Sequence, residues 1–208
     1  MADLVWLIPA FPLAGFVLIL LFGRRLGDPK AGYLATVMVF AAFASAALVF
    51  FDLLSKPSEE RETVVTLFSW LPVGTFQVDM AFLADPLSIT MCLFITFVGG
   101  LIHLFAVGYM HGDPKFSKFF LYLNLFVFSM TVLVLGENLL VTFLGWEGVG
   151  TCSYLLIAFW HSKESAATAG KKAFVTNRVG DWGVMVAMFL AFSAVGSLSY
   201  SVINESAE

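Results

Sequence analysis

The sequence predicts an all-α integral membrane protein with about six transmembrane helices and one short β-hairpin outside the membrane. Sixty per cent of its 208 residues are hydrophobic and only 12% are charged, and the mean hydropathy is +0.91. Ordinary soluble domains contain about 45–50% apolar and about 25% charged residues. A membrane-spanning helix needs about 20 apolar residues, so this length accommodates about six with their loops. The composition leaves no room for a large soluble domain. No basic cluster suggests nucleic-acid binding, so we expect no nucleic-acid partner.

Two apolar runs at the start predict the first two transmembrane helices. The first covers about Val5–Phe22, and Pro9 and Pro12 lie in its first turns, where a missing N–H costs least. A short basic loop follows, and the second helix covers about Gly32–Leu54. Together with the polar stretch after it, this pair forms a first unit of residues 1–62.

The stretch Thr63–Met80 has a different pattern. β-branched and aromatic residues form two runs, and the sequence Leu71-Pro72-Val73-Gly74 separates them. This pattern predicts a β-hairpin with a Pro/Gly turn. Because it is too short and too interrupted to cross a membrane, we expect a periplasmic hairpin over residues 63–82.

Residues 83–208 predict four further transmembrane helices and a polar tail. Asp85-Pro86 is a helix-start signal, and a tight turn at Gly136-Glu137-Asn138 separates two of the helices. The stretch His161–Lys172 is polar and basic, and is expected to be a loop. The four helices cover about Asp85–Tyr109, Phe119–Leu135, Leu139–Trp160 and Ala173–Val195.

The basic residues predict an orientation. Of the 11 Lys and Arg residues, eight fall in loops on one side of the predicted membrane, two fall on the other side, and Arg178 lies inside a helix. Cytoplasmic loops carry an excess of Lys and Arg. We therefore expect the eight to be cytoplasmic, with both termini and the hairpin on the outer side.

Glu147 lies near the middle of the fifth predicted helix, where a central carboxylate is costly by several kcal/mol. Each helical residue turns about 100°, so Thr151 and Tyr154 share its face and could hydrogen-bond a proton carrier. Two interpretations remain open for Glu147: proton or ion handling, or a structural buried acid. Small residues beside the acid leave room for another backbone or for water: Gly145, Gly148 and Gly150.

Arg178 and Asp181 are three residues apart on the sixth predicted helix and share a face with Lys171. They form either a self-neutralising ion pair or part of a pathway. Counted from the cytoplasmic ends, Glu147 and Arg178 lie about 13 and about 6 residues deep, so both fall within the hydrocarbon. A Glu/Arg/Asp cluster between the two helices is therefore geometrically possible. Lys171 is either a snorkelling anchor or a relay.

The other polar residues within predicted helices have alternative roles. His103 is either a packed core residue or a relay, and Asn124 is expected to bond a neighbouring helix. Cys92 and Cys152 are expected to be small packing residues, with no disulfide and no metal site. The chain itself is expected to hold no cofactor.

Three segments closely resemble a known family: LIHLFAVGYMHGDPKFSKFFLYLNLF, GENLLVTFLGWEGVGTCSYLLIAFW and KKAFVTNRVGDWG. They are similar to the antiporter-like L-type (subunit 5) chain of respiratory complex I, the proton-pumping NADH–quinone oxidoreductase. The resemblance implies that Glu147 is an essential proton-pathway acid, with Arg178 and Asp181 as its sixth-helix companions. Family members continue into later helices with a lysine that pairs with the glutamate. The chain thus resembles the N-terminal part only, a truncated antiporter-like half-repeat.

The resemblance also implies a function. The chain would be a non-redox, proton-translocating subunit of a multi-pass enzyme complex in the bacterial inner membrane. NADH, FMN, Fe–S clusters and quinone would belong to partner subunits, and its partners would be the other membrane-arm and redox subunits and lipids. The site would comprise Glu147, Arg178 and Asp181, with candidate relays His103, Thr151, Tyr154 and Lys171. The alternatives are the large subunit of a multi-subunit Mrp-type Na⁺/H⁺ antiporter and a non-transporting structural fragment.

Overall fold

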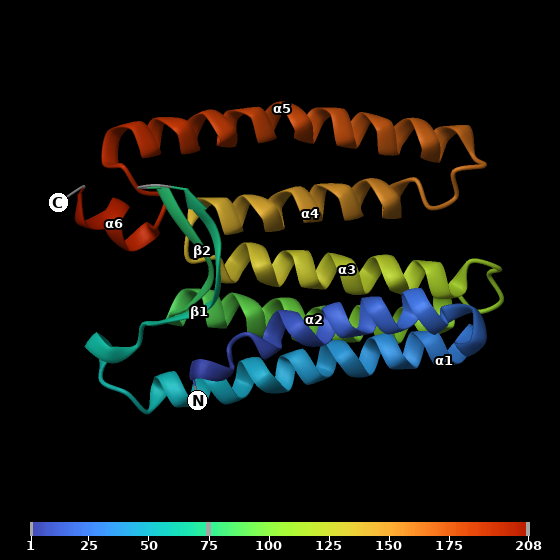
Figure 1. Cartoon of the computed structure of the whole chain (residues 1–208). Coiled ribbons are helices and arrows are strands. Elements are labelled where there is room, and N and C mark those ends of the chain that lie inside the picture. Colours follow the sequence, from blue (N-terminus) through green and yellow to red (C-terminus); the bar gives the residue numbers. More distant parts are fainter. Residues whose placement is uncertain (1, 74–75, 207–208) are drawn as a thin grey trace.

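The computed structural model describes residues 2–73 and 76–206 and shows a bundle of long helices that lie nearly parallel to one another (Figure 1). The helices and strands follow the chain as α1 (Leu7–Leu54), β1 (Thr63–Val73), β2 (Phe76–Ala84), α2 (Pro86–Tyr109), α3 (Phe116–Leu135), α4 (Leu139–Ile157) and α5 (Glu164–Val195). Three short elements complete the order: 3-10 turns at Ala2–Leu4 and Ser58–Glu60, and α6 (Tyr200–Glu205).

Five described helices are long and apolar enough to cross a membrane, and α1 is long enough to cross it twice. Inside α1 the backbone leaves the helix at Gly27, whose φ is 60°, and at the extended Asp28. A positive φ suits glycine, which lacks a Cβ. The break folds α1 into two antiparallel limbs (Figure 1), so the chain makes the six crossings that the sequence predicts.

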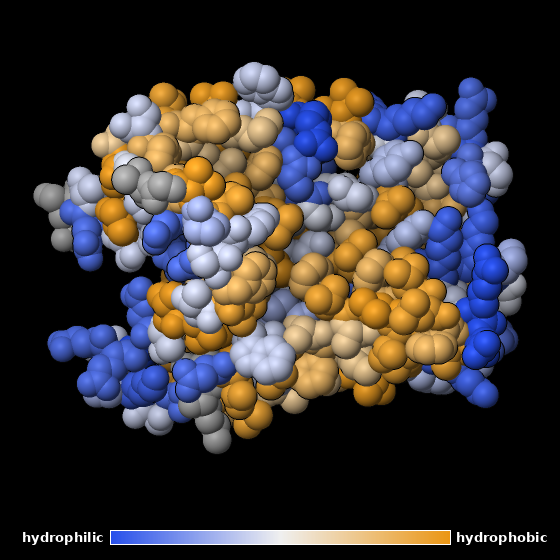
Figure 2. Space-filling model, in the orientation of Figure 1, coloured by the Kyte–Doolittle hydropathy of each residue, from blue (hydrophilic) through white to orange (hydrophobic). Residues whose placement is uncertain are grey.

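On the face that Figure 2 shows, apolar side chains cover much of the middle of the bundle, and hydrophilic residues gather toward both ends. Large apolar side chains on the outside of the helices are uncovered, among them Val179 on α5, which is 74% exposed. Such continuous apolar exposure is abnormal for a protein in water. It is the surface expected of a helical bundle in lipid.

The hairpin lies across one end of the bundle and is tied to the turns there. β1 and β2 pair antiparallel, with Thr63 opposite Ala84. The backbone N–H of Glu137 donates to the Ala81 carbonyl at 3.1 Å, and the Asn138 side chain donates to the Asp79 carbonyl at 2.9 Å. The predicted hairpin is confirmed, with β2 continuing to Ala84; Gly74 of the predicted turn lies outside the described residues.

Two predicted helix starts follow local capping chemistry. Asp85 accepts a 2.7 Å hydrogen bond from the Ser88 backbone N–H, and Ser88 returns the bond, which forms a capping box at the start of α2. Asn138 caps α4 by accepting from the Val141 N–H at 3.0 Å.

One predicted boundary is wrong. The stretch His161–Lys172 was expected to be a loop, but α5 begins at Glu164 rather than at Ala173. The residues in between are rich in alanine, the strongest helix former, and a helix need not end where the hydrocarbon ends. Arg178 is therefore about four turns into α5 rather than about six residues from its cytoplasmic end.

Candidate proton site between α4 and α5

The glycines of α4 determine which way Glu147 faces. A Cβ on Gly145 would lie 2.3 Å from the Leu133 backbone N, and one on Gly148 would lie 2.5 Å from Ser129 Oγ, so this face is packed directly against α3. Glu147 lies on the other side of α4, toward α5, and its side chain is 25% exposed. Gly145 and Gly148 thus serve the packing of α4 on α3, and Gly150 alone faces α5, with Asn177 Nδ2 at 3.9 Å.

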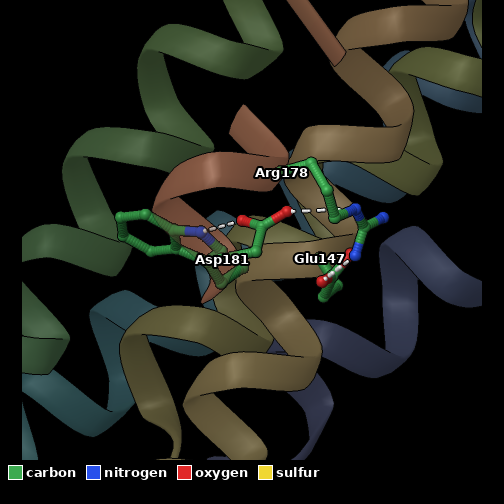
Figure 3. A network of polar contacts seen from close by, with 4 residues as sticks. Glu147, Arg178 and Asp181 are labelled. Carbon is green, nitrogen blue, oxygen red and sulfur yellow. Dashed lines mark hydrogen bonds and ion pairs between the residues drawn. The ribbon is translucent and has the colours of Figure 1, made fainter. Parts of the chain in front are cut away.

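Arg178 joins two carboxylates from different helices (Figure 3). Its Nη1 lies 2.5 Å from Glu147 Oε1 on α4, and its Nε lies 3.5 Å from Asp181 Oδ2 on its own helix. The cluster that the sequence allows therefore exists, because the earlier start of α5 brings Arg178 level with Glu147. An ion pair at these distances compensates charges that would be very costly alone in the hydrocarbon.

Trp146 is a member of the site that the sequence analysis did not include. Its indole Nε1 donates a 2.8 Å hydrogen bond to Asp181 Oδ1, and this is the fourth residue drawn in Figure 3. The side chain of Asp181 is only 6% exposed. A signal was present, because a tryptophan beside a mid-membrane acid needs an acceptor for its N–H.

Aromatic rings continue the site along the helix pair. The Arg178 guanidinium lies over the Phe174 ring at 5.1 Å, a cation–π contact, and the Tyr154 ring lies 5.6 Å from Phe174. Tyr154 is therefore beside the cluster but separated from Arg178 by an apolar ring.

The remaining candidate relays are not joined to the cluster by hydrogen bonds among the described residues. Thr151 and Lys171 are exposed on α4 and α5. His103 is 1% exposed and lies on α2, where it bonds its own helix at the Gly99 carbonyl and faces the Phe120 ring of α3.

A cavity of about 430 Å³ lies beside the cluster, with Trp146, Asn177 and Asp181 in its wall. Asp181 therefore has the indole and Arg178 as direct partners and open space next to it.

The acids and bases of the cluster do not balance in charge. Two carboxylates and one guanidinium carry a net charge of −1 when all are ionised. The cluster therefore holds one acid more than it holds bases. In the described part of the chain no three His, Cys, Asp or Glu residues group as metal ligands, and Cys92 and Cys152 are free thiols.

Comparison with known proteins places the chain in a family. Residues 70–120 match the family model described as "NADH-Ubiquinone oxidoreductase (complex I), chain 5 N-terminus", and residues 136–207 match "NADH:quinone oxidoreductase/Mrp antiporter, TM". NADH-quinone oxidoreductase subunit L of Mycobacterium tuberculosis is 50% identical over 196 residues, which is 94% of this chain and 31% of that protein. The chain thus spans about a third of the length of this curated relative.

Two solved structures share the fold. A chain of the membrane-bound sulfane sulfur reductase, an archaeal respiratory membrane complex, matches with a TM-score of 0.82 at 18% identity, over 97% of this chain and 39% of its own. A chain of the Mrp complex from Dietzia sp. DQ12-45-1b matches with a TM-score of 0.79 at 21% identity. The match covers 96% of this chain and 20% of the Mrp chain. The two family models and the 50% identity to a subunit L show that the chain belongs to the antiporter-like membrane-subunit family of NADH:quinone oxidoreductases and Mrp antiporters, on the subunit L (chain 5) branch.

Proposed function

We propose that this chain provides the first proton-handling unit of a proton-translocating subunit in an NADH–quinone oxidoreductase. The observation that supports the proposal most is the Glu147–Arg178–Asp181 cluster, in which one guanidinium contacts two carboxylates between two helices long enough to cross a membrane. The chain does no redox chemistry in this proposal. NADH, FMN, Fe–S clusters and quinone belong to partner subunits, and their reaction supplies the energy.

The cluster favours a proton role over a purely structural one. A structural ion pair needs one acid and one base, whereas Arg178 serves two acids. In this proposal the acid in excess over the guanidinium is the group that takes up and releases a proton. A change of charge next to a bidentate-capable guanidinium is the kind of local event that can move a helix or release a partner.

The location follows from the same proposal. The multi-pass helices place the chain in a membrane, and we assign it to the bacterial inner membrane with the hairpin on the periplasmic side. The basic residues on the opposite side support this orientation. The neighbouring partners are the other membrane-arm and redox subunits and lipids.

The test is Glu147→Gln in the full-length subunit within its complex. Gln keeps the shape of the side chain and can still accept from Arg178, but it cannot carry a proton. We expect normal assembly with strongly reduced ΔpH formation in vesicles. Glu164→Gln, the same substitution in the first turn of α5, is the matched control and should pump normally. If the Glu147→Gln variant pumps protons as well as the wild type, then Glu147 is a structural acid and does not carry a proton.

A second candidate is the large subunit of an Mrp-type Na⁺/H⁺ antiporter, which the matched family description also names. The two candidates differ in energy source. Uptake of protons that depends on NADH and quinone supports the first, and exchange that depends on a sodium gradient without redox subunits supports the second.

A further inference from the structure

Three polar side chains lie in one layer of the α1–α2–α3 bundle, away from the charged cluster. Gly99 of α2 lies against Val127 of α3 and Val39 of α1, since a Cβ there would meet their methyl groups at 3.7 and 3.9 Å. One turn along α2 from Gly99 is His103. One turn back along the antiparallel α3 is Asn124, and nearly one turn back along α1 is Thr36. These three residues therefore lie at the same depth: Thr36, His103 and Asn124.

The hydrogen bonds of His103 leave one acceptor without a protein donor. Its Nδ1 lies 2.7 Å from the Gly99 carbonyl oxygen, which only accepts, so Nδ1 carries the proton. In the neutral ring Nε2 is then a bare acceptor. The residue is 1% exposed, and no group among the described residues donates to Nε2.

Asn124 has the same deficiency. Its Nδ2 donates to the Phe120 carbonyl at 3.3 Å, and this bond determines which side-chain atom is the nitrogen. The other atom, Oδ1, is an acceptor that points toward Gly15 of α1, where a Cβ would lie only 2.7 Å from it. Asn124 is fully buried, and Oδ1 receives no hydrogen bond within the described part of the chain.

Thr36 does not supply the missing donor. Its Oγ1 already donates to the Gly32 carbonyl at 2.8 Å, within its own helix. The layer thus holds two buried acceptors on two helices, and no donor among the described residues reaches either of them. A direct bond between two acceptors is impossible, and an unsatisfied buried acceptor is costly. The group that can satisfy both has two donors, is small and is neutral, and water fits this description.

We propose that the layer is an internal water-binding site, in which bound water donates to His103 Nε2 and to Asn124 Oδ1. The water joins α2 to α3 through polar contacts that an apolar layer lacks. Its donation to Nε2 agrees with the ring tautomer of His103 that the Gly99 carbonyl determines, with Nδ1 protonated. A side chain at Gly15 would clash with Asn124 Oδ1, so this point of α1 needs a glycine. This site is independent of the proposed function, because it involves neither Glu147 nor α5.

The direct test is a structure of the assembled complex that contains the full-length subunit, at a resolution that shows ordered water. We expect water density within about 2.7–3.2 Å of both atoms. In Asn124→Leu the water at this layer should be lost, whereas Thr131→Val should keep it. Thr131 is a matched control, because it is equally buried on α3 but its hydroxyl already donates to Val127. A wild-type layer without water density would overturn the proposal.

A second measurement tests whether both residues share the water. The melting temperatures of the complex with His103→Leu, with Asn124→Leu and with both form a double-mutant cycle. Each single variant leaves one acceptor and its water poorly bonded, so we expect each to melt several degrees lower. The melting temperature of the double variant should fall by clearly less than the sum of the two single decreases. Additive losses would show that the two acceptors are satisfied separately and would overturn the shared site.

Discussion

The indole N–H of Trp146 donates a 2.8 Å hydrogen bond to Oδ1 of Asp181, and Arg178 contacts the other oxygen of the same carboxylate at 3.5 Å. A neutral donor from α4 and a charged donor from α5 therefore hold one almost fully buried acid. Because the contact to Arg178 is the longer of the two, the indole is the main direct partner of Asp181. Its bond fixes α5 against α4 beside Glu147.

We expect Trp146→Phe to destabilise the α4–α5 pair, because the buried Asp181 loses its best hydrogen bond. Hydrogen bonds to charged groups contribute about 1.5–3 kcal/mol, so the melting temperature of the complex should fall by several degrees. Trp182→Phe is the matched control: Trp182 is 65% exposed on α5 and forms no hydrogen bond among the described residues. Equal melting temperatures for the two variants would contradict a supporting role for Trp146.

Removal of Arg178 alone should be worse than removal of the whole cluster. Arg178→Leu leaves two acids without their cation in an apolar environment, whereas the triple variant Glu147→Leu/Arg178→Leu/Asp181→Leu leaves no charge there. We expect the amount of assembled complex to be lower for the single variant than for the triple one. Pumping should be lost in both. A single variant that assembles better than the triple one would show that the cluster does not act as a charge-balanced unit.

The charge bias of the loops predicts which residues face the cytoplasm. A cysteine at the exposed Ser58 should react with an impermeant thiol reagent added outside, and one at Lys118 should react only from inside. Lys118 is a better probe than its neighbour Ser117, whose hydroxyl donates to the Gly23 carbonyl at 2.8 Å. The native thiols Cys92 and Cys152 are buried and should stay unlabelled. The reverse labelling pattern would invert the topology.

The sequence predicts local structure well where a short motif alone determines how the backbone turns or where a helix begins. Asp85 before Pro86 predicts the start of α2, and the two β-branched and aromatic runs of Thr63–Met80 predict the hairpin. Both predictions are confirmed. The start of α5 was predicted nine residues too late because a polar, basic stretch is read as a loop. Hydropathy reports where a helix enters lipid, and carries no information on how far the helix continues outside.

The contacts of the site depended on information that a single helix does not contain. A helical wheel puts Arg178 and Asp181 on one face, but the partner of that face depends on how α4 and α5 rotate against each other. That rotation is determined by Gly145, which must lie against Leu133 of α3, and so by a third helix. The wheel likewise gives His103 a position but no partner, since the orphaned Nε2 becomes evident only when α1 and α3 surround it.

The contact between Asp28, at the break in α1, and the turn at Gly112 after α2 should weaken in acid. The backbone N–H of Gly112 donates to its carboxylate at 2.8 Å and lowers the pKa of Asp28; partial desolvation opposes the shift, and contact with His111 adds to it. A carboxyl whose folded pKa is depressed contributes stability that is complete above its ordinary pKa near 3.8 and is lost as the pH falls through the folded pKa. The Gly112 amide should therefore exchange hydrogen faster, relative to its intrinsic rate, once the pH is below about 4.

Asp28→Asn is the control for this acid sensitivity. The amide oxygen can still accept from Gly112, but it does not titrate. Protection of the Gly112 amide in this variant should be independent of pH across the same window. Acid-dependent protection that persists in Asp28→Asn would assign the effect to another group.

The last prediction concerns Gly145, which positions the site from the side opposite Glu147. An added methyl group would lie 2.3 Å from the backbone N and 2.5 Å from the Cα of Leu133, and backbone atoms cannot turn away as a side-chain end can. Gly145→Ala must therefore push α4 away from α3. Overpacking of this kind costs about 1–3 kcal/mol, and here it also shifts Glu147 relative to Arg178. We expect a lower melting temperature and reduced proton pumping. Gly108→Ala on α2 is the matched control, because no atom lies within 4 Å of its Cβ position and alanine is favoured over glycine in helices by about 1 kcal/mol. If Gly145→Ala pumps and melts like Gly108→Ala, then the approach of α4 to α3 does not determine the geometry of the cluster.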